Sequence, residues 1–239
     1  MWPFKSKISV KDSGLFLDFT DWHSHILPGV DDGIGKMEDA IEVLKTYDEL
    51  GIKKVWLTPH IMEDYPNETQ RLRVRYEELK KEWKGKAELA LASENMLDTL
   101  FEERLEANDL LPIGDEGNHL LVETSYFTPP YGMDDMLSNI KKKGYHVILA
   151  HPERYRYMEE KDYIKLKEND VLFQMNLLSL VGAYGETARK KAEWLLKKGY
   201  INYLGTDIHR LVGLLSHMDK TPTNQNALKS LSEIKALQP

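Results

Sequence analysis

The sequence predicts an α/β fold, a TIM-like barrel of about seven strand–helix units. Amphipathic, helix-like stretches that end at glycine alternate with short apolar segments, which is typical of parallel strand–helix units. Nearly every apolar segment ends in a histidine or a carboxylate. Because parallel barrels place their active sites at the carboxyl ends of the strands, this distribution favours a barrel. An open doubly wound sheet would instead gather its site at one crevice.

Four helix-like stretches carry glycine where a helix is expected to end. In the first of them, Ile41, Leu44 and Tyr47 share one helical face. A left-handed C-terminal cap favours glycine because glycine has no Cβ, and lysines precede three of the four glycines. The predicted caps are Gly51, Gly85, Gly144 and Gly199.

Seven apolar, β-prone segments are expected to form the strands. They lie near residues 15–21, 53–58, 86–93, 119–124, 145–150, 170–176 and 201–206. In the first segment, the alternation of Leu15, Leu17 and Phe19 predicts a strand face that continues into Asp21 and His23. The barrel should therefore have an apolar interior that becomes polar at its rim.

The side chains at the strand ends form a candidate metal-ligand set. Its members are His23, His25, Asp31, His60, Glu94, Glu123, His151, Asp207 and His209. Taken singly, His60 could be a hydrogen-bonded loop residue, and either glutamate could begin a helix. The joint pattern favours a metal site. The sixth segment offers only Gln174 and Asn176, and we assign no role to His119, His146 and His217.

Two acidic residues of the stretch DWHSHILPGVDDG are expected to lie outside the ligand set. Asp21 more plausibly supports a histidine than binds an ion itself. Asp32 has no expected role beyond starting the next helix.

The chain contains no cysteine, so nitrogen and oxygen atoms are its strong metal ligands. This donor set favours manganese, with iron or zinc as alternatives, in an open site that also holds water. The candidate ligands exceed the needs of one ion and carboxylates can bridge, so we expect two or three divalent ions. The absence of cysteine also excludes disulfides and a thiolate nucleophile.

Composition limits the partners. The net charge of −7, from 32 basic and 39 acidic residues, argues against nucleic acid as a ligand. No stretch has the roughly 20 apolar residues of a membrane span, and the start MWPFKSK is too short for a secretory signal. We therefore expect a cytoplasmic protein without membrane insertion, either monomeric or a homo-oligomer.

Several motifs resemble one protein superfamily. DWHSHILPGVDDG is similar to the opening motif of the polymerase and histidinol phosphatase (PHP) superfamily. The continuation ILPG-x-DDG resembles its bacterial manganese-dependent protein-tyrosine phosphatase branch, which is tied to capsule and exopolysaccharide synthesis. TPH at 58–60, SEN at 93–95, LVETS at 121–125, HPERY at 151–155 and GTDIH at 205–209 match that branch in order.

The resemblance implies a distorted seven-unit barrel with three metal positions. The first would be held by His23, His25, Glu94 and Asp207. In the second, Glu94 would act as a bridge together with Glu123 and His151. The third would be held by Asp31, His60 and His209. Residues 1–239 are expected to form one PHP domain, with the barrel at about 15–215 and a polar tail at about 219–239 that contains one short amphipathic helix.

The resemblance also implies how the substrate is held. Arg154 of HPER matches a phosphate-binding arginine, and Arg154, Asp207 and His209 are expected to take part in catalysis. The second arginine of the branch has no clear equivalent, and Arg210 is the nearest candidate at a shifted position. Four aromatic residues just beyond the ligands could flank an aryl group or simply pack their loops. They are Tyr126, Phe127, Tyr131 and Tyr155.

The expected function is metal-dependent hydrolysis of a phosphomonoester. The most favoured substrate is a phosphotyrosine-bearing protein, a bacterial tyrosine kinase of capsule or exopolysaccharide synthesis. One alternative is a small-molecule phosphatase such as a histidinol-phosphate phosphatase. Another is a metal-binding regulatory module without turnover, which the missing second arginine would favour.

Overall fold

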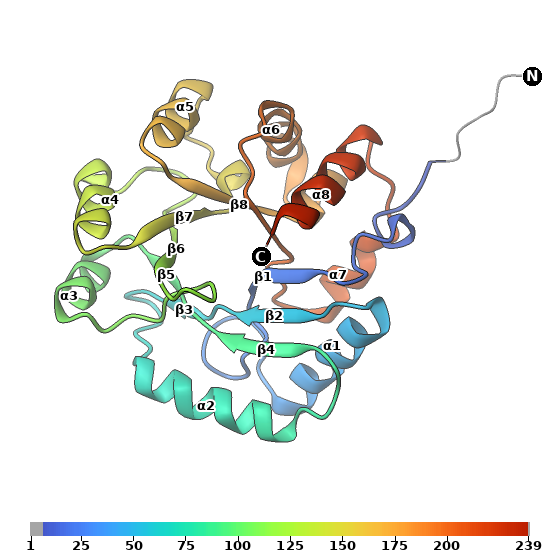
Figure 1. Cartoon of the computed structure of the whole chain (residues 1–239), viewed down its shortest axis with the longest axis horizontal. Helices are drawn as coiled ribbons and strands as arrows, with labels where there is room; N and C mark the ends of the chain where they lie inside the picture. The colour runs from blue at the N-terminus through green and yellow to red at the C-terminus, as the bar shows by residue number, and fades with distance from the viewer. Residues whose placement is uncertain (1–6, 239) are drawn as a thin grey trace, which may run out of the picture.

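Short parallel strands surrounded by helices make up the computed structural model, which describes residues 7–238 (Figure 1). The first sheet has the order β1 (Thr20–Ser24), β2 (Lys54–Leu57), β4 (Glu88–Leu91). The second has the order β3 (His60–Ile61), β5 (Glu94–Met96), β6 (His119–Glu123), β7 (His146–Ala150), β8 (Leu172–Asn176), β9 (Tyr203–Gly205). All pairs of neighbouring strands in these two sheets are parallel, which confirms the expected α/β class.

Two of the expected strands are each divided between the two sheets. The segment near 53–58 forms β2, passes through Thr58 and Pro59, and enters the second sheet as β3. Proline has no N–H to donate to a ladder, so an interruption at Pro59 is expected. The segment near 86–93 likewise forms β4 and then continues as β5. These two crossings distort the arrangement but leave the order of the seven expected segments intact.

The first and last strands lie side by side. The amide of Asp207 donates to the carbonyl of His23 at 2.8 Å, and the amide of His25 donates to the carbonyl of Ile208 at 3.1 Å. The buried carboxylate of Asp21 adds a side-chain link between the same two segments. It accepts hydrogen bonds from the amide and hydroxyl of Thr206 and from the hydroxyl of Tyr47.

The prediction for the first strand is wrong in two respects. Asp18 has a φ of 55°, in the left-handed region, so the extended run begins only at Thr20, and Leu17 is 60% exposed. In addition, the register between β1 and β2 shifts between Asp21 and Ser24. Such a bulge breaks the simple alternation of faces. Asp21 therefore contacts α1 through Tyr47, whereas His23 contacts the ligands at the strand ends.

Helices cover the strands, and three of the four glycines predicted to end a helix lie at or just after a helix C-terminus. The helices are α1 (Met37–Leu50), α2 (Thr69–Glu82), α3 (Thr99–Ala107), α4 (Met133–Lys142), α5 (Glu160–Glu168), α6 (Gly185–Lys198) and α7 (Leu211–Met218). Gly51 and Gly199 are left-handed C-caps, and Gly144, with a φ of 93°, follows the end of α4. The cap predicted at Gly85 is wrong, because α2 ends at Glu82 and Trp83 leaves it in an extended conformation.

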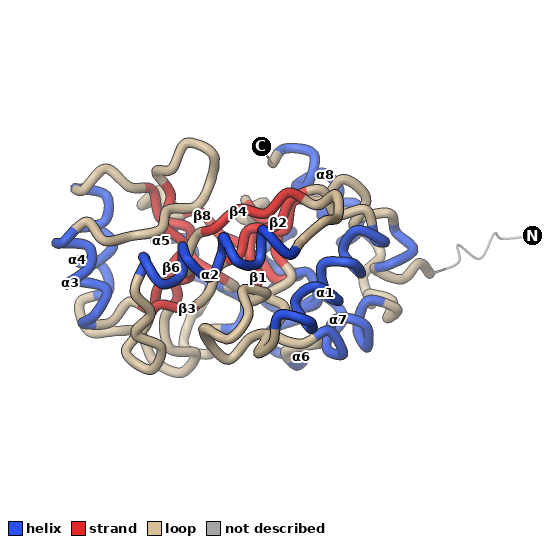
Figure 2. The backbone as a smooth tube through the Cα atoms, turned by 90° about the horizontal axis from the view of Figure 1, so that it is seen from below, coloured by secondary structure: helices blue, strands red, loops and turns tan. Residues whose placement is uncertain are grey.

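The C-terminal tail contains the expected amphipathic helix. This helix, α8 (Asn226–Leu237), buries Ala227, Leu228 and Leu231 and packs against β9 and α6. Figure 2 shows the strands between the helices, with α3 and α4 at one end and α1 and α7 at the other. Within residues 7–238, every helix is too short or too polar to cross a membrane.

Candidate metal centre

Histidine and carboxylate side chains from six strand ends meet in one place. Four groups bring three or more ligand atoms within 4.8 Å of one another. The groups are His23–His25–Asp207, His23–Glu94–His151, His60–Glu94–Glu123 and His25–Asp32–His60–His209. All of the ligands expected from the sequence except Asp31 take part. Apart from Asp32 in the loop before α1, the side chains belong to β1, β3, β5 and β6 or lie shortly after β1, β7 and β9.

The two histidines of β1 face a shared carboxylate. The Nε2 atoms of His23 and His25 lie 3.1 Å apart, and they lie 3.1 and 3.2 Å from Oε2 of Glu94. Oδ1 of Asp207 lies 3.6 Å from His23 Nε2 and 3.4 Å from His25 Nε2. These four side chains are the set that the resemblance implies for the first metal position.

Glu94 lies between this set and a second one. Its Oε1 is 2.9 Å from Nε2 of His151, and its Oε2 is 3.1 Å from Nδ1 of His60. Glu123 approaches the same two rings, with Oε1 at 3.0 Å from His60 Nδ1 and Oε2 at 3.7 Å from His151 Nε2. Glu94 therefore lies between the two sets, where the resemblance implies a bridging carboxylate.

Asp32 takes the place in the third group that the sequence assigned to Asp31. Oδ1 of Asp32 lies 3.6 Å from Nε2 of His60 and 3.5 Å from Nε2 of His209. The carboxylate of Asp31 is turned inward, where Oδ2 contacts Nδ1 of His25 at 2.9 Å and accepts the amide of His60 at 3.0 Å. Asp31 thus contacts the ring of an expected ligand without joining a ligand group, as residues that orient a metal ligand do.

Gly33 explains why the loop can return over the histidines. A Cβ at this position would lie 2.3 Å from the carbonyl oxygen of His25 and 2.5 Å from its Cβ, which no side chain tolerates. The amide of Gly33 also donates to Oδ1 of Asp31 at 3.0 Å. Glycine is therefore required here for the close approach that brings both aspartates to the site.

Several buried ligand atoms lack a hydrogen-bond partner, and we used them to test whether the residues fit a metal. Nδ1 of His60, Oε2 of Glu94 and Oε1 of Glu123 have none among the described residues, although the nitrogen lies 3.1 Å from the first oxygen and 3.0 Å from the second. Buried polar atoms without a partner are costly and rare. Atoms that converge without aligned hydrogen bonds fit divalent ions, which would complete their interactions.

The pKa values of the clustered side chains show that the carboxylates need positive charge beside them. Burial alone would lower the pKa of His23, but Glu94 and Asp207 outweigh it and raise this pKa to about 9. The pKa of His60 rises to about 10 because the neighbouring glutamates outweigh its burial. The carboxyl of Glu94, although buried, has its pKa held well below the usual range by His23 and His60. Protonated imidazoles therefore balance the carboxylates when no ion does so.

Strand β8 supplies two supporting residues. Oε1 of Gln174 lies 2.7 Å from Nδ1 of His23, and Nδ2 of Asn176 donates to Oδ2 of Asp207 at 2.7 Å. Both side chains lie in the sixth predicted segment, from which no ligand was expected. Asp21, expected to support a histidine, accepts the backbone amide of His23 at 3.2 Å in addition to its hydrogen bonds from Thr206 and Tyr47.

Two of the candidate ligands have an unusual backbone conformation. His151 has a φ of 34° and Asp207 a φ of 52°, both in the left-handed region that residues other than glycine rarely adopt. Such conformations cluster at functional sites, where the surrounding structure holds them.

A cavity of about 460 Å³ opens beside the ligands. Asp32, His60, Asp207 and His209 line it together with two arginines and three further side chains. These residues are Arg154, Arg210, Tyr126, Tyr184 and Leu214. His217, to which we assigned no role, also lines it. A larger cavity of about 650 Å³ lies between α4 and α5, but it contains none of the candidate ligands, so we place the site at the smaller one.

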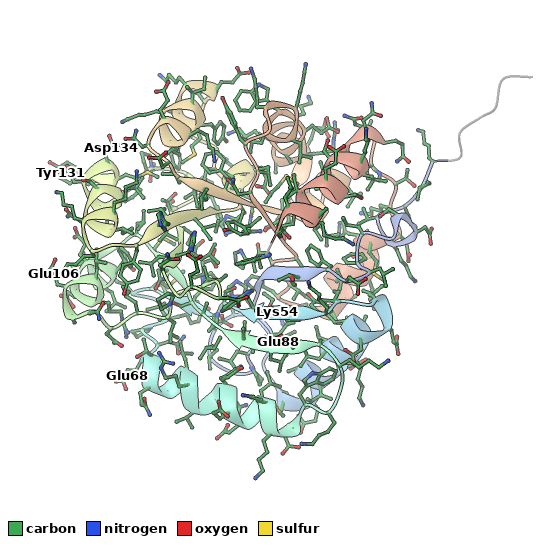
Figure 3. The ribbon with its side chains drawn as sticks, in the orientation of Figure 1. Lys54, Glu68, Glu88, Glu106, Tyr131 and Asp134 are labelled. Atoms are coloured by element: carbon green, nitrogen blue, oxygen red, sulfur yellow. The ribbon has the colours of Figure 1, made fainter. Side chains whose placement is uncertain are left out.

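Of the four aromatic residues that could either flank an aryl group or pack their loops, only Tyr126 lines the cavity. Tyr155 is fully buried, and its hydroxyl donates to the carbonyl of Ala150. Phe127 is 63% exposed, and Tyr131 is fully exposed at the outer edge of the molecule, close to Asp134 of α4 (Figure 3). Tyr184 was missed, because no nearby motif marks it in the sequence.

Comparison with known families identifies the chain. Residues 19–232 match the family described as "Capsular polysaccharide synthesis, CpsB/CapC". The chain belongs to the CpsB/CapC family. This assignment confirms the resemblance to the capsule-linked branch that the DWHSHILPGVDDG and HPER motifs indicated.

Members of the CpsB/CapC family align with most of the chain. The tyrosine-protein phosphatase CpsB of Streptococcus pneumoniae is 30% identical over 206 residues, covering 80% of this chain and 83% of that relative. YwqE of Bacillus subtilis, also named a tyrosine-protein phosphatase, is 28% identical over 80% of this chain and 77% of its own length. The putative tyrosine-protein phosphatase CapC of Staphylococcus aureus is 27% identical over 89% of this chain and 85% of its own length.

Solved structures support the fold. The crystal structures of YwqE and CpsB, described as unique metal-dependent tyrosine phosphatases, include a chain with a TM-score of 0.74 at 24% identity. The match covers 92% of this chain and 95% of that one. The lactonase Lmo2620 of Listeria monocytogenes has a TM-score of 0.56 at 12% identity, covering 95% and 88% of the two chains.

Proposed function

We propose that this member of the CpsB/CapC family is a metal-dependent protein-tyrosine phosphatase. The proposed substrate is a phosphotyrosine-bearing protein, a bacterial tyrosine kinase of capsule or exopolysaccharide synthesis. The observation that carries the proposal is the convergence of unpartnered, buried histidine and carboxylate atoms beside a cavity that contains Arg154. The names of the relatives, which are tyrosine-protein phosphatases, support it.

The proposed cofactors are two or three divalent ions, of which Mn²⁺ suits the nitrogen and oxygen ligands. The first position comprises His23, His25, Glu94 and Asp207. The second comprises Glu94, Glu123 and His151. In the third, Asp32 replaces the expected Asp31 beside His60 and His209. Bound ions of this kind lower the pKa of water to form a nucleophile and neutralise charge on a phosphoryl group.

The chain's own residues then hold the substrate. The guanidinium of Arg154 presents N–H donors to the cavity, which suits phosphoryl oxygens because charged hydrogen bonds to phosphate are short and strong. Arg210 at the cavity wall offers a second positive charge. Asp207 and His209 border the same space. A tyrosine leaving group has a pKa of about 10, so it needs less protonation than an alkyl alcohol.

The proposed substrate also bears on the place and form of the protein. A tyrosine kinase uses ATP, which is a cytoplasmic metabolite, so we propose that this phosphatase acts in the cytoplasm. Its working form would be the whole chain as one domain, since α8 of the tail packs on β9 and α6. Neither nucleic acid nor membrane insertion enters the proposed activity.

Initial rates on competing substrates test the proposal. The protein is stripped with a chelator, reloaded with Mn²⁺, and supplied with a phosphotyrosyl peptide or with histidinol phosphate. We expect a higher kcat/KM for the peptide and no turnover by the stripped protein. A preference for histidinol phosphate would indicate a small-molecule phosphatase. A chain that binds metal but turns over neither substrate would be a regulatory module.

A further inference from the structure

Arg154 is held by side chains from three separate elements. Its Nη1 donates to Oδ2 of Asp207, which follows β9, at 2.7 Å. Its guanidinium carbon lies 4.3 Å from the ring centroid of Tyr126, in the loop after β6, and 4.4 Å from that of Tyr184, which precedes α6. Aromatic faces attract a guanidinium both as a cation and as a planar group.

The position of Tyr184 depends on a glycine-bounded turn. Gly182 and Gly185 on either side of it have φ values of 80° and 88°, which only glycine adopts easily. The turn presents the ring of Tyr184 to Arg154, and the Tyr184 hydroxyl lies 3.5 Å from Oδ2 of Asp207. Tyr126 reaches Arg154 from a different segment, the loop after β6. The carbonyl of Tyr126 accepts the amide of Arg156 at 2.8 Å, which ties this loop to the segment that carries Arg154.

Most donors of Arg154 are left free by these contacts. A guanidinium has five N–H groups, and within residues 7–238 Asp207 is the only acceptor bonded to this one. The side chain is 20% exposed and lines the cavity beside the candidate ligands. Rings that contact the group restrain its movement without using its donors.

We propose that Tyr126 and Tyr184 are positioning residues that hold the guanidinium of Arg154 so that its free N–H groups bind the phosphoryl group of the substrate. This inference rests on the proposed phosphatase function. The restraint matters because a long arginine side chain can otherwise turn toward neighbouring carboxylates such as Glu94. The other basic residue of the cavity, Arg210, is exposed and forms no salt bridge with any described residue.

Two variants of Tyr184 separate the ring from the hydroxyl. Tyr184→Leu removes the ring and should lower kcat/KM for a phosphotyrosyl peptide about tenfold, mainly through KM, which is the size expected for one desolvated cation–ring contact. Tyr184→Phe keeps the ring and should retain nearly wild-type kinetics. Bound metal per chain should stay unchanged in both. Tyr145→Leu serves as the control, because the Tyr145 hydroxyl bonds to Asn108 outside the site.

A double-mutant cycle tests whether Tyr184 acts through Arg154. In an Arg154→Ala background, Tyr184→Leu should cause no further loss. An equal loss in both backgrounds would overturn the inference, as would a Tyr184→Phe variant as impaired as Tyr184→Leu, since the hydroxyl near Asp207 would then be responsible. If Tyr184→Leu fails to fold by circular dichroism, Tyr126→Leu replaces it in the same cycle.

Binding of inorganic phosphate separates this inference from the proposed function. Calorimetry on the Mn²⁺-loaded protein should show weaker phosphate binding for Tyr184→Leu and Arg154→Ala, and unchanged binding for Tyr184→Phe and Tyr145→Leu. If the phosphate affinities follow this pattern but the protein hydrolyses no phosphotyrosine, the proposed phosphatase function would be refuted. The role of the two tyrosines in positioning Arg154 would still hold. Equal phosphate binding by the wild type and Tyr184→Leu would refute the role of the tyrosines.

Discussion

Asp31 and Asp32 are adjacent in the chain but meet opposite environments. The side chain of Asp31 is fully buried, and its pKa is lowered because the adjacent His25 outweighs the effect of burial. The side chain of Asp32 is 51% exposed, and its hydrogen bond with His209 lowers its pKa to about 2. Both carboxylates are therefore ionised at neutral pH, yet only Asp32 faces the cavity.

Replacing each aspartate by asparagine distinguishes a ligand from its support. We expect Asp32→Asn to lose one bound ion per chain, because an amide is a weak ligand for a divalent cation. Asp31→Asn should keep the full number of ions but bind them about 10- to 100-fold more weakly, as for other groups that orient a ligand. Elemental analysis after dialysis at two metal concentrations measures both effects. Loss of one ion in Asp31→Asn, with only weaker binding in Asp32→Asn, would instead make Asp31 the ligand of the third metal position.

This pair also shows a limit of sequence reasoning at the residue scale. The motif identifies an acidic pair followed by glycine, but it does not show which carboxylate turns inward. That choice depends on Gly33, which lies against the carbonyl of His25 and sets the path of the loop. The contact between Gly33 and His25 also fixes Asp32 relative to His60 and His209, which are distant in the sequence.

At the scale of elements, glycine has different effects at the end and in the interior of a helix. Gly199 caps α6 with a φ of 69° and has open space where a Cβ would lie. Gly213 lies within α7, is exposed, and also has open space around a Cβ. Backbone conformation is therefore the main difference between these two positions.

Alanine at the two positions should change stability in opposite directions. Gly199→Ala should lower the free energy of unfolding by about 1 kcal/mol, the cost of a left-handed residue with a side chain. Gly213→Ala should raise it by about 0.5–1 kcal/mol, because alanine loses less backbone entropy in a helix. Urea denaturation followed by circular dichroism measures both changes. A loss of stability in Gly213→Ala would show that α7 tolerates no Cβ there.

The element predictions succeeded where the signal is local. Apolar, β-prone runs located the strands from β2 onward, and Gly51 and Gly199 cap their helices as expected. The failures have identifiable causes. The first strand is shorter than expected because Asp18 is left-handed and β1 contains a bulge. Helix α2 ends before Gly85 because Trp83 is extended, and the indole N–H of Trp83 donates to the carbonyl of Ala87.

For the whole molecule, protons and metal ions compete for the same site. His23 and His60 have pKa values of about 9 and 10 when no ion is present, so both rings carry protons at neutral pH. A metal ligand must be an unprotonated nitrogen, so metal binding releases these protons. The apparent metal affinity should therefore rise as the pH rises toward these pKa values and fall as the pH is lowered.

Calorimetric titration with Mn²⁺ at pH 7.5 measures this coupling. The heat of binding should differ between two buffers of different ionisation enthalpy, by an amount that corresponds to proton release. The same titration at pH 6.5 should give a weaker apparent affinity. Identical heats in both buffers would mean that the imidazoles are already neutral, and the charge balance described for the cluster would be wrong.

The site as a whole was more predictable than its details. Placing ligands at the ends of parallel strands needs only the order of the elements, and eight of the nine expected side chains lie in the four ligand groups. The contacts of Tyr184, Gln174 and Asn176 could not be expected in the same way, because each depends on loop paths and on side chains that are distant in sequence.

The central claim is that the strand-end cluster binds divalent ions and uses them to hydrolyse phosphotyrosine. The most direct test adds Mn²⁺ stepwise to the stripped protein and measures bound metal and phosphate release from a phosphotyrosyl peptide in the same samples. We expect release to begin only as metal binds and to reach a plateau at about two or three ions per chain. Full activity without metal, or a filled site without phosphate release, would contradict the claim.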